Sequence, residues 1–155
     1  MNRVVRGGLA GLVATGAMSG VMAGGRYLGL LGTPPPKKIT AHLEQRVGIR
    51  NELSYPEFQG SWLASHFGYG TANGALFGLL RPLLPLPDAL AGLGYGMLLW
   101  AVSYLGIMPG LGLHRPATRD SLSKQGVMVA AHLVYGFVLA RANARLAARA
   151  ASRAA

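Results

Sequence analysis

The segment His66–Gly78 reads HFGYGTANGALFG and carries the pattern that decides the fold of this chain. Its histidine and the glycines Gly70, Gly74 and Gly78 recur every four residues, so in a helix they lie along one face. Small residues at this spacing are typical of helix contacts inside membranes, where they let two backbones approach closely. The stretch therefore predicts a membrane helix whose glycine face, with His66, is turned toward other helices.

The same pattern, H-x-x-Y-G, occurs again as HLVYG at His132–Gly136, although the chain has only four histidines. Two more pairs keep the same order in both halves: LAGL at 9–12 and 90–93, and YLG at 27–29 and 104–106. Together the pairs predict a duplicated helical hairpin. Because each unit has two spans, the repeat is parallel, about an axis along the membrane normal. His66 and His132 are then equivalent positions that face each other.

The composition is that of a membrane protein rather than a soluble domain. The 155 residues suggest one domain. Charged residues make up 13%, about half the usual share, and hydrophobic residues make up 51%. The net charge of +10 comes from basic residues that flank apolar segments, which favours contact with anionic lipid headgroups and argues against nucleic acid as a partner. The lack of cysteine excludes disulfides and thiolate sites.

Four segments are long and apolar enough to cross a bilayer, which needs roughly 20 residues per helix. They are residues 7–31, 60–80, 89–113 and 121–140. We therefore expect an all-α integral membrane protein with four transmembrane helices in a single domain, 1–155. The first segment is taken as a span rather than a cleaved signal peptide, because its apolar run is long and no A-x-A site follows.

The connections also make predictions. The proline cluster TPPP at Thr33–Pro36 is expected to end the first helix, since proline cannot continue the helical hydrogen bonds. Residues 37–48 have the pattern of an amphipathic helix that lies in the headgroup plane, with an ordinary solvated loop helix as the alternative.

The C-terminal segment 141–155, RANARLAARAASRAA, has an arginine every four residues and no acid. We expect it to continue the fourth helix out of the bilayer, with lipid headgroups bound by Arg141, Arg145, Arg149 and Arg153. Such a basic end marks the cytoplasmic side of a membrane. With an even number of spans the N-terminus is cytoplasmic too.

Further small-residue stripes predict further helix contacts. In the first segment these are Gly16, Gly20 and Gly24, and in the fourth the stripe runs from His132 through Gly136 to Ala140. Both histidines should then point into the bundle, as ionisable residues in membrane helices generally do.

Three interpretations of the histidine pair stay open. In the first, a neutral imidazole forms a structural hydrogen bond across helices to Tyr69, Tyr135, a nearby hydroxyl or a backbone carbonyl. In the second, the pair ligates a b-type haem. In the third, it relays protons or a solute through the bundle centre. No residue set forms a catalytic constellation or a metal site, so we expect no enzyme.

The layout resembles the YagU-like family of small bacterial inner-membrane proteins, a family of unknown function. The resemblance rests on four features: the segment GLAGLVATGAMSG at 8–20 followed by TPPP, His66 in the second helix, LAG at 90–92 opening the third, and AHLV at 131–134 with trailing arginines in the fourth. It implies a multi-pass protein of the bacterial inner membrane and no reaction.

We therefore expect a non-enzymatic role, such as an accessory or structural subunit of a membrane complex. The expected partners are the lipid bilayer and other membrane subunits or a second copy of the chain. Two alternatives remain: a haem-binding electron carrier held by two histidines, and a small channel or transporter. No cofactor is expected outside the haem alternative.

Overall fold

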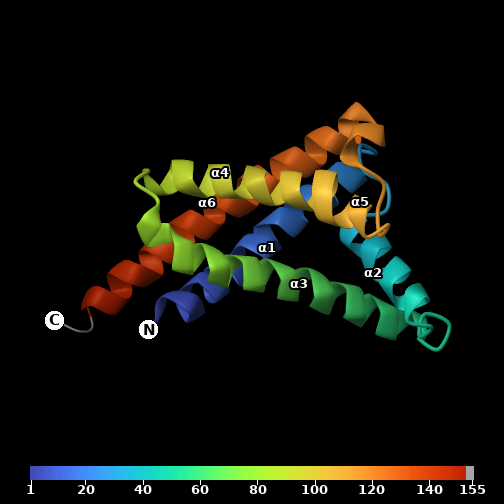
Figure 1. The fold of residues 1–155 in the computed structure, drawn as a ribbon, viewed down its shortest axis with the longest axis horizontal. Coiled ribbons are helices and arrows are strands. Elements are labelled where there is room, and N and C mark those ends of the chain that lie inside the picture. Colours follow the sequence, from blue (N-terminus) through green and yellow to red (C-terminus); the bar gives the residue numbers. More distant parts are fainter. Residues whose placement is uncertain (153–155) are drawn as a thin grey trace.

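The computed structural model describes residues 1–152, and that part of the chain is helical without any strand. Five helices account for it (Figure 1). They are α1 (Arg3–Tyr27), α2 (Pro35–Arg46), α3 (Tyr55–Leu80), a composite helix made of α4 (Asp88–Ala101), the π-helix η2 (Val102–Ile107) and α5 (Met108–Gly110), and α6 (Leu122–Ser152). The short 3-10 turns η1 (Arg81–Leu83) and η3 (Ala117–Arg119) lie in the connections. The all-helical prediction is thus confirmed.

The four long helices pack side by side in the order α3, α1, α6, α4. The N-terminal helix α1 therefore contacts both α3 and α6, whereas α4 packs on α6. The short helix α2 packs on α3 at the end of the molecule remote from both termini (Figure 1). Each long helix runs from one end of the molecule to the other, so the two chain ends lie at the same end (Figure 1).

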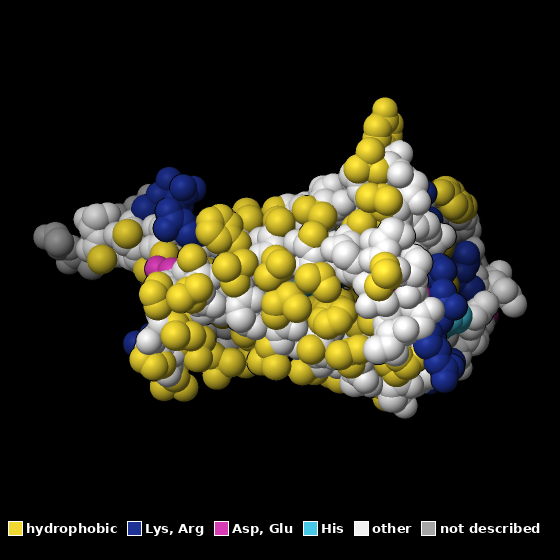
Figure 2. All heavy atoms as spheres, turned by 90° about the horizontal axis from the view of Figure 1, so that it is seen from above, with side chains coloured by type: hydrophobic (Ala, Val, Ile, Leu, Met, Phe, Trp, Pro, Cys, Tyr) yellow, Lys and Arg dark blue, Asp and Glu magenta, His cyan; other side chains and the backbone are white. Residues whose placement is uncertain are grey.

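Three of these helices are long and apolar enough to cross a membrane: α1, the composite helix Asp88–Gly110, and α6. The fourth predicted span lies in α3, which is 26 residues long. Its histidine, asparagine, serine and glycine residues lower its mean hydropathy, so α3 is long enough but not apolar enough to count among these three helices. Figure 2 shows hydrophobic side chains over the middle of the molecule and lysine and arginine gathered at its two ends.

The helix boundaries differ from the predictions at two places, for local reasons. Helix α1 ends at Tyr27, and Gly29 follows with a φ of +71°, a backbone conformation that glycine adopts readily. The prediction that the prolines end this helix is wrong, because Pro35 instead opens α2, where its missing N–H costs nothing. Helix α3 begins at Tyr55, ahead of residue 60, because Glu57 accepts hydrogen bonds from the Ser54 N–H (2.8 Å) and hydroxyl (2.6 Å).

Helix α6 continues without a break beyond residue 140 and is helical to Ser152. Arg141, Arg145 and Arg149 are exposed along it, and Arg153 lies outside the described residues. Near its end α6 is tied to the start of α1, since the Arg6 guanidinium donates from Nε to the buried Asn143 side chain (3.1 Å).

Candidate functional site

The contact between α1 and α3 is made by glycine backbones. A Cβ atom added to Gly74 would lie 2.5 Å from Gly11 Cα and 2.5 Å from the Gly7 carbonyl oxygen. A Cβ on Gly11 would in turn lie 2.5 Å from the Gly70 carbonyl oxygen. Gly78 contacts the backbone of Gly7 in the same way. Glycine is therefore required along this seam, because the neighbours that a side chain would meet are main-chain atoms that cannot rotate away.

The contact between α4 and α6 is a second glycine seam. A Cβ on Gly136 would lie 2.8 Å from the Gly92 carbonyl carbon and 3.1 Å from Gly96 Cα. A Cβ on Gly92 would lie 2.6 Å from the Ala140 side chain. Gly92 thus contacts Gly136 and Ala140 as Gly11 contacts Gly70 and Gly74, and the LAGL and H-x-x-Y-G motifs place these residues at corresponding positions.

The packing prediction for Gly16, Gly20 and Gly24 is wrong within this chain. All three are exposed, and a Cβ at any of them would meet no atom of residues 1–152 within 4 Å. The physical reason is angular: Gly16 is five residues from Gly11, which turns it by about 140° from the face that contacts α3. The spacing of Gly7 and Gly11 is the same four residues, so periodicity alone did not distinguish the buried stripe from the exposed one.

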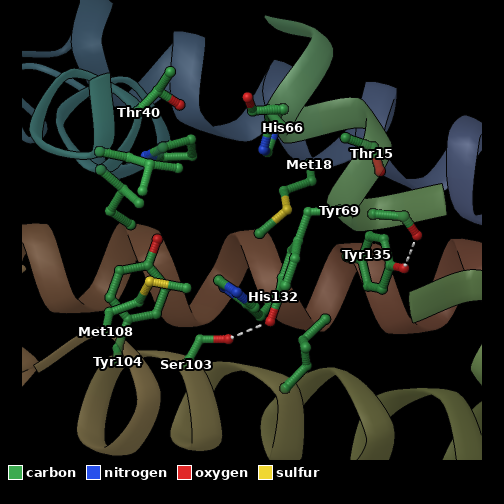
Figure 3. A pocket seen from close by; sticks show the side chains of 16 residues that line it. Thr15, Met18, Thr40, His66, Tyr69, Ser103, Tyr104, Met108, His132 and Tyr135 are labelled. Carbon is green, nitrogen blue, oxygen red and sulfur yellow. Dashed lines mark hydrogen bonds between the residues drawn. The ribbon is translucent and has the colours of Figure 1, made fainter. Parts of the chain in front are cut away.

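The half of the molecule that holds the termini is closed, whereas the half nearer α2 contains a cavity of about 180 Å³. In the closed half the side chains of Ala10, Phe77 and Leu139 have no exposed surface. The cavity is lined by side chains from α1, α2, α3, the α4–η2–α5 helix and α6 (Figure 3). His66 and His132, buried to 8% and 4% exposure, both line it from α3 and α6.

The hydrogen bonds of the two histidines differ. His66 Nε2 lies 3.1 Å from the Ser19 hydroxyl on α1, and that hydroxyl donates to the Thr15 carbonyl (2.8 Å). His132 Nδ1 lies 2.7 Å from the Met128 carbonyl on its own helix. Neither histidine bonds to the tyrosine of its motif among the described residues.

Those tyrosines bond elsewhere around the cavity. The Tyr135 hydroxyl donates to the Gly70 carbonyl of α3 (2.6 Å), and the Tyr69 hydroxyl lies 3.0 Å from the Ser103 hydroxyl (Figure 3). Tyr135 therefore ties α6 to α3, and Tyr69 ties α3 to η2, where α3 and α4 do not pack closely.

The π-helix η2 shapes one wall of the cavity. A π-helix widens the turn and is often found at functional sites. Here it brings Ser103 and Tyr104 into the interior, at 3% and 6% exposure. The Tyr104 ring lies nearly perpendicular to the rings of His132 and His114, each at a centroid distance of 5.7 Å. Ser103, Tyr104 and Ser19 are site residues that sequence reasoning missed, because no local signal marks a π-helix or selects one serine among many.

The polar groups that line this cavity are two imidazoles and the hydroxyls of serine, threonine and tyrosine. No carboxylate lines it, and among residues 1–152 no three histidine or acidic side chains are placed to hold a metal ion. A drug-sized ligand occupies a pocket of roughly 300–1,000 Å³. At about 180 Å³ this cavity is smaller than that range.

Outside the membrane-capable helices, Asp120 organises the connection before α6. Its carboxylate accepts from Lys124 (2.7 Å) and Arg115 (3.1 Å). Burial alone would raise the pKa of this carboxyl, but the hydrogen bond and charge of Lys124, with His114 and Arg115, hold the pKa below its ordinary value. In the same region burial lowers the pKa of His114. His42 Nδ1 lies 2.8 Å from the Leu113 carbonyl, and this contact joins α2 to the segment between α5 and α6.

The comparisons with known proteins identify the family. No curated protein and no solved structure matches the chain. One family model, described as a family of unknown function (DUF6789), matches residues 1–154. Because that match covers almost the whole chain, the chain belongs to this family of unknown function (DUF6789).

Proposed function

We propose that the chain is a single four-span domain of the bacterial inner membrane, with both termini in the cytoplasm and a non-enzymatic role. The observation that carries the fourth span is the seam between α1 and α3. Gly7 and Gly11 of α1 lie against Gly78 and Gly74 of α3, so these segments must lie at the same depth. If α1 crosses the bilayer, α3 crosses it beside α1, whatever its own hydropathy.

Two further features support the arrangement. The seams of α1 with α3 and of α4 with α6 use corresponding motif positions, which is what a parallel repeat of two helical hairpins predicts. At the end that holds the termini, Arg141, Arg145 and Arg149 are exposed in a segment that has no acid, which is the pattern of a cytoplasmic end.

The topology can be tested with single cysteines, because the chain has none. We would replace exposed residues at the two ends, Asn51 and Thr118 at one, Pro85 and Ala148 at the other. A membrane-impermeant maleimide added from the periplasmic side should label Asn51→Cys and Thr118→Cys and leave Pro85→Cys and Ala148→Cys unlabelled until lysis. The reverse pattern would invert the orientation, and labelling of Asn51→Cys and Pro85→Cys from the same side would contradict a spanning α3.

The non-enzymatic role is supported by what the helices enclose. The lining that residues 1–152 give the cavity includes no carboxylate, and the half of the molecule that holds the termini is packed around the fully buried side chains of Ala10, Phe77 and Leu139. The tight packing of that half favours a structural role over a channel. An accessory or structural subunit remains the role that fits best.

Such a subunit contacts other membrane proteins through its outer apolar surface. In residues 1–152 a Cβ at Gly20 of α1 would meet no atom within 4 Å, and this position is flanked by exposed apolar side chains such as Leu12 and Val13. A cysteine at Gly20 should cross-link to one partner of defined mass, a second copy or another subunit. The control is Leu98→Cys on α4, where Leu98 is 59% exposed, and it should give no product. Equal cross-linking at both positions, or none at either, would contradict a specific partner.

A further inference from the structure

The two cavity histidines each keep one ring nitrogen free, and their contacts say which one. A neutral imidazole has one N–H donor and one acceptor nitrogen. His132 Nδ1 lies 2.7 Å from the Met128 carbonyl, and a carbonyl oxygen can only accept. Nδ1 therefore carries the proton, and Nε2 of His132 is the acceptor.

The protonated ring nitrogen of His66 is assigned from the two contacts of the Ser19 hydroxyl. The Ser19 hydroxyl has a single proton, and we assign it to the shorter of its two contacts, the 2.8 Å hydrogen bond to the Thr15 carbonyl. The Ser19 oxygen can then only accept at its 3.1 Å contact with His66 Nε2. Nε2 of His66 therefore carries the proton, and Nδ1 of His66 is the acceptor.

Both acceptor nitrogens reach open space. Neither His66 Nδ1 nor His132 Nε2 has a hydrogen-bond partner in residues 1–152. The buried side-chain nitrogens and oxygens that are both sealed from solvent and unpaired in that range are Glu44 Oε2 and Trp100 Nε1. The two histidine nitrogens are not among them, so each is accessible, and the space that both side chains line is the cavity.

A hydroxyl donor faces the same space. Tyr69 and Ser103 share one hydrogen bond of 3.0 Å, which uses one of their two O–H protons and leaves the other available. The lining given by residues 1–152 has no carboxylate that could pair with a cationic ligand. The polar edge of the cavity thus suits a neutral ligand that donates a hydrogen bond to a histidine nitrogen.

The size and lining of the cavity restrict the ligand further. An engineered apolar cavity of about 150 Å³ binds benzene, so a volume of about 180 Å³ suits one six-membered ring. The apolar part of the lining includes Met18, Leu99 and Met108, which would contact the faces of such a ring. The cavity is partly open to the surface, and its lining includes Tyr69 and Leu43, which are 42% and 49% exposed, so a chain attached to the ring can leave the cavity.

We propose that this cavity binds the ring of a neutral, lipid-soluble phenol or hydroquinone, with a ring hydroxyl donating to His132 Nε2 or His66 Nδ1. Both H-x-x-Y-G motifs then supply the same group, an acceptor nitrogen, to one site. This site goes beyond the proposed membrane role and depends on it only for the route by which the ligand arrives.

The first test uses the unaltered protein in detergent, with ¹⁵N-labelled histidine. Its NMR spectrum should show His66 protonated at Nε2 and His132 protonated at Nδ1. We would then titrate p-cresol against 4-methylanisole, which has the same ring without a donor. A buried hydrogen bond is typically worth enough for a preference of about five- to tenfold for p-cresol. That titration should also shift the unprotonated nitrogen of His66 or His132. Equal affinity for the two compounds, no binding of p-cresol, or the opposite tautomers would overturn the proposal.

The second test identifies the acceptor. His66→Phe and His132→Phe keep a ring of similar volume and remove the nitrogens, and at least one should abolish the preference for p-cresol. His42→Phe is the matched control, because His42 lies outside this cavity, and it should keep the preference. A preference that survives both cavity variants would contradict the site. Failure of the cysteine topology experiment would overturn the membrane role and leave these binding results intact.

Discussion

Replacing Gly74 by alanine gives the sharpest test of how the helices are held together. The added Cβ would lie 2.5 Å from both Gly11 Cα and the Gly7 carbonyl oxygen. To reach an ordinary contact of at least 3.4 Å, α1 and α3 must separate by about 0.9 Å, since both neighbours are main-chain atoms. A gap of that size forfeits a quarter to a half of the dispersion energy of each contact along the seam.

The magnitude follows from two opposing terms. Overpacking of this kind costs roughly 1–3 kcal/mol, and opening the rest of the seam adds to that cost. Alanine in place of glycine within a helix recovers about 0.5–1 kcal/mol. We therefore expect Gly74→Ala to destabilise the protein by about 2 kcal/mol, as measured by equilibrium unfolding in mixed micelles followed by circular dichroism.

The matched control is Gly20→Ala on α1, where a Cβ meets no atom within 4 Å. This variant keeps only the favourable helix term and should leave the stability unchanged or raise it by up to about 1 kcal/mol. If Gly74→Ala is as stable as the parent protein, or if the two variants are equally destabilised, the glycine seam does not hold α1 and α3 together.

Three further predictions concern single contacts. Tyr135→Phe removes the buried hydrogen bond to the Gly70 carbonyl and should lower the free energy of unfolding by about 1 kcal/mol, whereas Tyr27→Phe, 91% exposed, should not change it. Glu44→Ala removes the carboxylate of α2 that accepts from the Ser61 hydroxyl of α3 (2.5 Å) and should speed amide hydrogen exchange in α2. Glu52→Ala on the exposed loop should not change that exchange. Equal exchange rates in the two variants would show that the Glu44–Ser61 hydrogen bond does not hold α2 on α3. Because the folded-state pKa of Asp120 lies below its unfolded value, its ion pairs stabilise the protein above the unfolded pKa, and this stabilisation is lost as the pH falls through the folded pKa. In Asp120→Asn that part of the acid dependence of unfolding should disappear, and an unchanged pH profile would show that Asp120 does not contribute.

The helices were predictable from the sequence to different degrees. Long apolar runs bounded by basic residues identified α1, α6 and the Asp88–Gly110 helix. The start of α3 was placed too late, because the capping pair of Ser54 and Glu57 lies in a polar stretch that carries no hydrophobic signal. The π-helix η2 was not foreseen, since its apolar sequence is compatible with an ordinary α-helix as well.

For the candidate site, the repeated pentapeptide singled out His66 and His132, and the structure places both on one cavity. Their hydrogen-bond partners could not be derived from the sequence. The Ser19 hydroxyl is 47 residues from His66, and its position depends on how far α1 slides along α3. The register of α1 along α3 is determined by which glycines of the two helices come into contact. It depends on both helices together and cannot be read from the sequence of one of them.

The sequence by itself determined that this chain is helical, where its apolar segments lie, and which residues of each helix share a face. Only the tertiary structure decided which of those faces are buried, why Gly11 lies in a seam while Gly16 does not, and which histidine nitrogens remain free in the cavity. The physical reason is that the buried and the exposed faces of each helix differ little in hydrophobicity. On α1 the exposed face carries Leu12 and Val13, and the buried face carries Ala10 and Ala14, so both faces are apolar. Periodic hydrophobicity then cannot choose between them, and the close fit of one backbone against another does.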